Sequence, residues 1–213
     1  MRTHPDNELV NLSGEQAILD AAETLFAEKG FDAVSLSAIA MLANTSKPNI
    51  YHHFKNKNEL YLAIIKTAVQ RASDLLDKLE DGPGSFRQRL AGFSAGQLDN
   101  IIAHGRSTQL ILREALSGNS ERGREVANFM VREVFSRLVA MVRQGQQDGE
   151  FRDDIDPTLA AFMIESANLF YFQTTPMMKN IPEINYSDDA SEFSEGVMDI
   201  IFNGVLKKCE GTK

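Results

Sequence analysis

Residues 35–54 read SLSAIAMLANTSKPNIYHHF, and this stretch predicts two short helices joined by a tight turn. Ser35 and Ser46 each precede a run compatible with a helix, where a serine hydroxyl can accept a hydrogen bond from a free backbone N–H. Asn44 lies between the two runs and tolerates a left-handed backbone. Pro48 falls in the first turn of the second helix, where its missing N–H does no harm. This spacing is typical of a helix-turn-helix.

The second of these helices carries two different faces. Ile50 and Phe54 are four residues apart, so they share one face and are expected in the core. The other face, called the recognition face below, comprises Lys47, Pro48, Tyr51, His52 and Lys55. It offers two ammonium groups, a phenol and an imidazole but no carboxylate, a composition that suits phosphate oxygens and base edges.

The rest of the chain is also predicted to be helical, because apolar residues recur three and four positions apart and strict alternation is absent. A first helix is expected to begin at Ser13, which is spaced from Gln16 as in a capping box, and to end at Gly30. Phe26 in this helix and Ile39 in the next are expected in the core. Asn56 and Glu59 are expected to open a long fourth helix.

This fourth helix and those that follow are expected at about 57–80, 86–103, 106–116, 120–147, 157–173 and 190–208. Asp156 and Pro157 give a strong start signal for the fifth of these six. The segment from Gln173 to Ala190 is expected to be an irregular loop. The predicted fold class is therefore all-α. A three-helix DNA-binding domain at residues 1–56 would be joined by the long helix to a helical domain at residues 57–213.

Composition and charge set limits on the class of protein. The chain has 213 residues, of which 43% are hydrophobic, and this content excludes a disordered chain. Its longest nearly apolar stretch, Leu159 to Phe172, is interrupted by Glu165 and is too short to span a membrane. The single cysteine, Cys209, excludes an internal disulfide. A cytoplasmic protein without a membrane partner is expected.

The formal charge of −8 argues against a nucleic-acid partner, but the charge is unevenly distributed. Between Ala33 and Asn58 there is no acidic residue, and Lys47, Lys55 and Lys57 contribute a charge of +3. The predicted helix-turn-helix is therefore the basic part of an acidic chain.

The same region resembles a known family. The run ILDAAETLFAEKGF at residues 18–31, the two runs at 35–43 and 46–54, and then Lys57 and Leu60 resemble the DNA-binding segment of TetR-family transcriptional regulators. The resemblance covers about a fifth of the chain. Asn44 and Thr45 depart from the Gly-Val that the family commonly has in the turn.

The resemblance implies a dimeric repressor that binds a palindromic double-stranded DNA operator and is released by a small-molecule effector. Tyr51 and Lys57 are expected to bind phosphate, with Lys47, Pro48 and Asn49 nearest the bases. The residues expected to touch DNA are Ser35, Ser37, Thr45, Lys47, Pro48, Asn49, Tyr51, His52, Lys55 and Lys57.

The C-terminal half is expected to bind the effector and to form the dimer, although its aromatic and methionine residues also fit an ordinary core. Effector contacts are expected from Phe93, Leu110, Arg113, Phe129, Met130, Phe162, Ser166 and Phe170. The polar residues that could orient a ligand are Arg113, Glu114, Glu165, Ser166 and Asn168. The dimer interface is expected on the last two helices, at Phe193, Val197, Ile200, Ile201 and Val205.

Two alternatives remain at this point: an activator or ligand-independent regulator of the same fold, and an all-helical enzyme or partner-binding module. Residues Gly92 to Gly96 match the nucleophile-elbow pattern around Ser94, but no strand precedes them as that motif requires. The sequence contains no HExxH, paired CxxC or phosphate-binding glycine loop. No catalytic residue, metal or cofactor is therefore expected.

Overall fold

The computed structural model describes residues 14–116, 121–181, 183 and 189–205, and within these ranges the chain forms helices and no strand. The all-α prediction is confirmed. The predicted cap at Ser13 lies outside the described residues. The chain divides into two compact units, which are described separately below.

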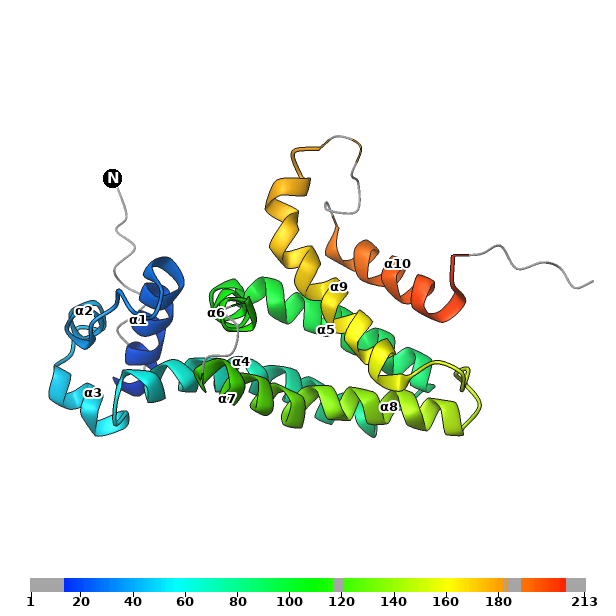
Figure 1. The fold of residues 1–213 in the computed structure, drawn as a ribbon, viewed down its shortest axis with the longest axis horizontal. Coiled ribbons are helices and arrows are strands. Elements are labelled where there is room, and N and C mark those ends of the chain that lie inside the picture. Colours follow the sequence, from blue (N-terminus) through cyan, green and yellow to red (C-terminus); the bar gives the residue numbers. More distant parts are fainter. Residues whose placement is uncertain (1–13, 117–120, 182, 184–188, 206–213) are drawn as a thin grey trace, which may run out of the picture. The chain divides into compact units, whose positions relative to one another are not determined.

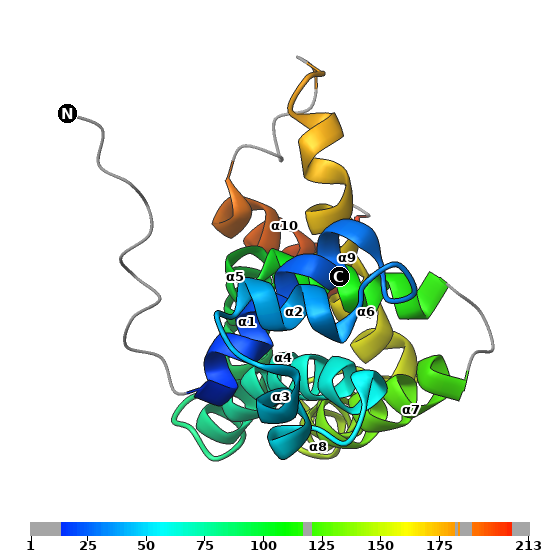
Figure 2. The same cartoon turned by 90° about the vertical axis from the view of Figure 1, so that its left-hand side faces the viewer.

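Unit 1 consists of described residues up to 68 together with residues 106–116 and 121–129. Its helices are α1 (Gly14–Lys29), α2 (Leu36–Leu42), α3 (Lys47–His53), the first half of α4 (Lys57–Glu80), α6 (Gly105–Leu116) and α7 (Glu121–Met130). The first three helices lie against one another in both views of the ribbon (Figure 1, Figure 2). The predicted domain border at residue 56 therefore differs from the division seen in the structure, because part of α4 and the later helices α6 and α7 belong to this unit.

Local signals in the sequence produce the helix boundaries of unit 1. The Ser35 hydroxyl accepts from the backbone N–H of Ala38, and the Ser46 hydroxyl accepts from that of Asn49. Asn44 has a φ of 49°, which is the left-handed conformation expected for the turn. The helix-turn-helix predicted from these residues is confirmed.

The core of unit 1 contains the apolar residues that the helical spacing predicted. Phe26, Ile39 and Ile50 are fully buried, and Phe54 is nearly so. Phe26 packs edge-on against Tyr61 of α4 with ring centroids 5.2 Å apart. These contacts fix α3 with its recognition face outward.

Unit 2 consists of described residues 69–105 and those from 130 onward. Its elements are the second half of α4, α5 (Phe86–Ala103), the π-helical turn η2 (Val131–Phe135), α8 (Ser136–Gln147), α9 (Pro157–Met178) and α10 (Ala190–Asn203). Helix α5 is central, because it packs against α8, α9 and α10 (Figure 1). Arg137 of α8 pairs with Asp77 and Glu80 of α4, and this joins the two helices.

The structure corrects three predicted elements. The helix expected over 190–208 ends at Asn203, where Gly204 has a positive φ of 72°. The helix expected over 120–147 is interrupted by the π-helical turn, whose wider i→i+5 hydrogen bonding the periodicity did not signal. The helix expected to end at residue 173 continues to Met178, although Pro176 lies within it. Pro176 removes one backbone hydrogen bond, and only two helical residues follow it, so little of the helix lies beyond the disturbance. Within the described ranges, no helix is long and apolar enough to cross a bilayer.

Candidate nucleic-acid interface and ligand pocket

The recognition face is exposed along α3. Tyr51 has 54% of its surface exposed, and Lys47, Pro48, His52 and Lys55 are also exposed. The serines at the start of α2, Ser35 and Ser37, are exposed as well. The first turn of α3 offers little free backbone N–H to an anion, because Pro48 has none and those of Asn49 and Ile50 donate to the Ser46 hydroxyl and carbonyl.

Two of the predicted DNA contacts are held in place by each other. Thr45 and Asn49 are half-buried, and the Asn49 side-chain amide donates to the Thr45 hydroxyl over 2.9 Å. The bond links the turn to the first residues of α3. The bond leaves the side-chain oxygen Oδ1 of Asn49 and the second hydrogen of its side-chain amide for another partner.

Lys57 has a role that the sequence reasoning missed. Its ammonium donates to the backbone carbonyls of Phe31 and Val34 over 2.8 and 2.9 Å, and it lies 4.2 Å from the centre of the Phe31 ring. The prediction that Lys57 binds phosphate therefore competes with contacts inside unit 1. The sequence around Lys57 does not indicate these contacts, because their carbonyl partners lie 26 and 23 residues earlier in the chain.

A buried polar network lies behind the helix-turn-helix in unit 1. The Glu114 carboxylate, only 3% exposed, accepts from the Tyr61 hydroxyl over 2.9 Å and from Arg122 Nε over 2.8 Å. Burial, followed by the charge of Glu114, raises the pKa of Tyr61 well above its ordinary value, so its phenol stays protonated. The Arg122 guanidinium also lies over the rings of Phe31 and Tyr61.

Arg113 and Glu114 therefore have internal partners in unit 1. Arg113 donates to the backbone carbonyls of Phe26 and Ala27 over 2.9 and 3.1 Å at the C-terminal end of α1, where the Phe26 carbonyl also accepts from the Gly30 N–H. The sequence suggested that both side chains could orient an effector. In the structure they connect α6 to α1, α4 and α7 instead.

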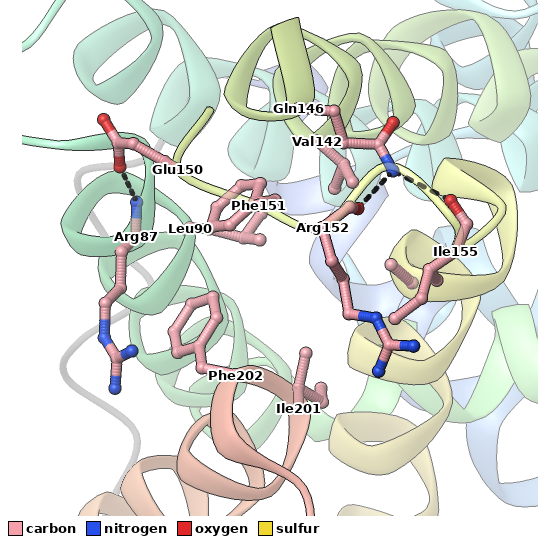
Figure 3. A pocket seen from close by; sticks show the side chains of 11 residues that line it. Arg87, Leu90, Val142, Gln146, Glu150, Phe151, Arg152, Ile155, Ile201 and Phe202 are labelled. Carbon is pink, nitrogen blue, oxygen red and sulfur yellow. Dashed lines mark hydrogen bonds between the residues drawn. The ribbon is translucent and has the colours of Figure 1, made fainter. Parts of the chain in front are cut away.

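A cavity of about 170 Å³ opens in unit 2 (Figure 3). The aromatic rings of Phe151 and Phe202 stack with centroids 5.8 Å apart and lie between the side chains of Arg87 and Arg152. Gln146 donates to the carbonyls of Arg152 and Ile155, which holds the segment between α8 and α9. The apolar lining is Leu90, Val142, Phe151, Ile155, Ala160, Ile201 and Phe202.

None of the predicted effector residues lines this cavity. Phe93 and Leu110 are fully buried, while Phe162 and Phe170 are exposed. The half-buried ones are Phe129, Met130 and Ser166. Leu110, Arg113 and Phe129 belong to unit 1 and the other five belong to unit 2, so neither unit contains the whole predicted set.

The predicted dimer residues are likewise divided. Phe193 packs against Tyr171 with ring centroids 4.4 Å apart, Val197 is half-buried, and Ile201 lines the cavity. Ile200 and Val205 are exposed. Helix α9 also carries a row of exposed apolar residues, of which Phe162 and Phe170 were predicted to contact the effector. The row consists of Leu159, Phe162, Met163, Phe170 and Met177.

Ser94 does not form a nucleophile elbow. It lies in the middle of α5 and is fully buried, whereas that motif needs a strained strand-to-helix turn that exposes the serine. The match between residues 92–96 and the motif is therefore a coincidence.

Comparison with known proteins adds two family matches. Residues 18–64 match the family model described as bacterial regulatory proteins, tetR family. Residues 87–198, more than half of the chain, match the model described as tetracyclin repressor-like, C-terminal domain.

Relatives match over most of their length. The HTH-type transcriptional repressor NicS of Pseudomonas putida is 26% identical over 80% of this chain and 81% of its own. FadR from Bacillus subtilis in complex with stearoyl-CoA is 21% identical, with a TM-score of 0.73 over 90% of this chain and 99% of its own. AibR in complex with isovaleryl coenzyme A and operator DNA is 21% identical, with a TM-score of 0.69 over 89% of this chain and 98% of its own. These two structures share the fold of this chain.

Proposed function

Because the chain belongs to the TetR family of bacterial regulatory proteins, we propose that it is a dimeric repressor that binds a palindromic operator through its recognition face. Family membership makes it a transcriptional regulator rather than an enzyme. The observation that carries the operator proposal is the exposed face of Lys47, Pro48, Tyr51, His52 and Lys55, which has cations and hydrogen-bonding groups but no acid.

Tyr51→Ala and Lys47→Ala should each weaken DNA binding by about 1–3 kcal/mol while leaving the fold intact. Both side chains are exposed, so their removal opens no cavity. The measurement is an electrophoretic mobility assay on an operator selected from random DNA. Unchanged affinity in both variants would refute the assigned face.

A matched control is Lys66→Ala, since Lys66 is exposed on α4 and lies over the Phe129 ring rather than on the recognition face. Its effect on operator affinity should be small. Operator affinity should also fall steeply as salt rises, because phosphate contacts release bound counterions. An affinity that does not change with salt would contradict phosphate binding.

We further propose that the exposed apolar face of α9 forms the subunit interface, together with Ile200 of α10 and Val205, which follows that helix. Exposed apolar residues in such a row are typical of surfaces that another protein covers. A two-fold dimer also matches the symmetry of a palindromic operator.

Phe170→Asp should raise the dimer dissociation constant at least tenfold, because it places a charge at a site that the partner subunit would desolvate. Phe170 is 63% exposed in the isolated chain, so the variant monomer should remain folded. Analytical ultracentrifugation over a concentration series measures the change. Asp153→Ala, an exposed substitution outside this face, is the control, and equal dissociation constants for the two variants would argue against the interface.

The effector is proposed to be an anionic molecule with an apolar acyl group, bound in the cavity of unit 2. Arg87 and Arg152 provide cations beside the apolar lining. Arg152 also forms an ion pair with Asp154. FadR was solved with stearoyl-CoA and AibR with isovaleryl coenzyme A, and both ligands have this chemistry.

Arg87→Ala should raise about tenfold the concentration of isovaleryl-coenzyme A or stearoyl-coenzyme A that releases the operator, whichever of the two acts on the wild type. The Arg87 backbone N–H, which donates to Glu150, is kept in this variant. Release is followed by fluorescence anisotropy of labelled operator. Arg143→Ala removes an exposed arginine of α8 that does not line the cavity, so it should leave the response unchanged.

A further inference from the structure

A polar cluster is enclosed where α5, α9 and α10 meet in unit 2, at residues that do not line the cavity. Ser94, Asn168 and Ser194 are buried there. The Asn168 side-chain amide donates to the Ser94 carbonyl over 2.9 Å, and the hydroxyls of Ser194 and Ser94 are 3.2 Å apart. One helical turn away on each of α5 and α9, Gln97 hydrogen-bonds the Glu165 carboxyl group.

These bonds leave three buried oxygen atoms without a hydrogen-bond donor: Gln97 Oε1, Glu165 Oε1 and Asn168 Oδ1. A buried polar atom without a partner costs about 1–3 kcal/mol, and native proteins contain few of them. All three atoms are acceptors. Apart from the Ser94 hydroxyl and a proton on Glu165, the cluster has no further donor for these acceptors. The three atoms belong to one place, because residues 165 and 168 are neighbours on the same helix face and Gln97 bonds Glu165.

The cluster also lacks a positive charge. Burial raises the pKa of Glu165 to about 7, and among the described residues only the Gln97 hydrogen bond acts in the opposite direction. A lysine or arginine partner would hold this pKa low instead, as expected for a paired carboxylate. Glu165 is the one member with an acidic side chain, so an ionised Glu165 needs a cation that the described chain does not provide.

We propose that the cluster of Gln97, Glu165 and Asn168 binds the primary ammonium group of a small molecule. An ammonium group carries one positive charge and three N–H donors, which match one carboxylate and three acceptor oxygens. A quaternary ammonium has the charge without the donors, and a carboxylate has neither. The site is therefore selective for an amine, and it is separate from the cavity beside Arg87 and Arg152.

The test uses n-butylammonium, tetramethylammonium and n-butyrate as probes on the full chain. Saturable binding, followed by chemical-shift changes and thermal shift, is expected for n-butylammonium only. Equal responses to tetramethylammonium would overturn the proposal, since charge alone would then suffice. No saturable response to n-butylammonium would also overturn it, because a buried water would then be enough to satisfy the acceptors.

Glu165→Gln keeps the shape of the side chain and removes its charge, so n-butylammonium should bind at least tenfold more weakly. Glu150→Gln, which changes a carboxylate at the cavity, should leave amine binding unchanged. Equal amine affinity in Glu165→Gln and the wild type would overturn the proposal. The three probes decide the question on the unmodified chain even if a variant does not fold.

The pH dependence gives a second readout. Below about pH 7 Glu165 holds a proton that the ammonium must displace, so affinity should rise with pH up to about 7 and then level off. Glu165→Gln should show no such rise, and a rise of the same size in this variant would overturn the role of Glu165. These measurements need no operator, so their failure is distinguishable from a failure of the proposed repressor function.

Discussion

Phe54→Ala should lower the free energy of unfolding by about 3–5 kcal/mol, the range for removing a buried aromatic ring. Phe54 is 5% exposed and directly follows α3, where its backbone N–H donates to the Ile50 carbonyl. Loss of the ring removes packing from the end of the recognition helix. Operator binding should therefore disappear as an indirect effect. Urea denaturation of the isolated protein measures the first effect, and a mobility assay measures the second.

Two variants separate packing from recognition at this position. Phe54→Leu keeps most of the volume and should cost less than about 1.5 kcal/mol. Tyr51→Ala should show the opposite pattern, with operator binding weakened and stability retained. A Phe54→Ala protein as stable as the wild type would show that this ring does not support the helix-turn-helix.

Glu114→Ala should lower the free energy of unfolding by about 3 kcal/mol. The carboxylate is buried and holds both the Tyr61 hydroxyl and Arg122 Nε, so its loss leaves two donors without their partner. This loss of stability is at the low end of the roughly 3–5 kcal/mol expected for breaking a buried ion pair, because the Arg122 side chain is partly exposed to solvent. Chemical denaturation is again the measurement.

Glu125→Ala is the matched control, because Glu125 is an exposed carboxylate on α7 and its removal should cost less than about 0.5 kcal/mol. Glu114→Gln keeps an oxygen that can accept from Tyr61 and should fall between the two. If Glu114→Ala and Glu125→Ala had the same stability, the network would contribute nothing to unit 1.

The boundaries of the helix-turn-helix were predictable because they depend on neighbouring residues. Ser35 and Ser46 cap helices through hydrogen bonds to residues three positions ahead, and Asn44 needs only its own backbone freedom. The inward residues Ile50 and Phe54 follow from helical spacing alone. For the same reason, the exposed recognition face could be described before the structure.

Contacts between distant parts of the chain were not predictable from these rules. Arg113 reaches the carbonyl of Phe26, 87 residues earlier, so nothing near Arg113 in the sequence distinguishes it from a ligand-binding arginine. The exposure of Phe162 on α9 depends on where neighbouring helices pack, because an apolar helix leaves both faces possible. The cavity could not be predicted, because its lining residues come from four separate helices and the segment between α8 and α9 and meet only in the folded chain.

The contacts of Lys57 have a consequence for how a signal can reach DNA. Lys57 and Tyr61 occupy the first two turns of α4, and both are bound to α1 or to the residues just after it. A tilt of α4 that kept these contacts would therefore carry α1 and the segment after it along with the start of α4. In the proposed dimeric repressor, effector binding would then alter the distance between two recognition helices. Repression would be lost when that distance no longer matches the roughly 34 Å between successive major grooves on one side of DNA.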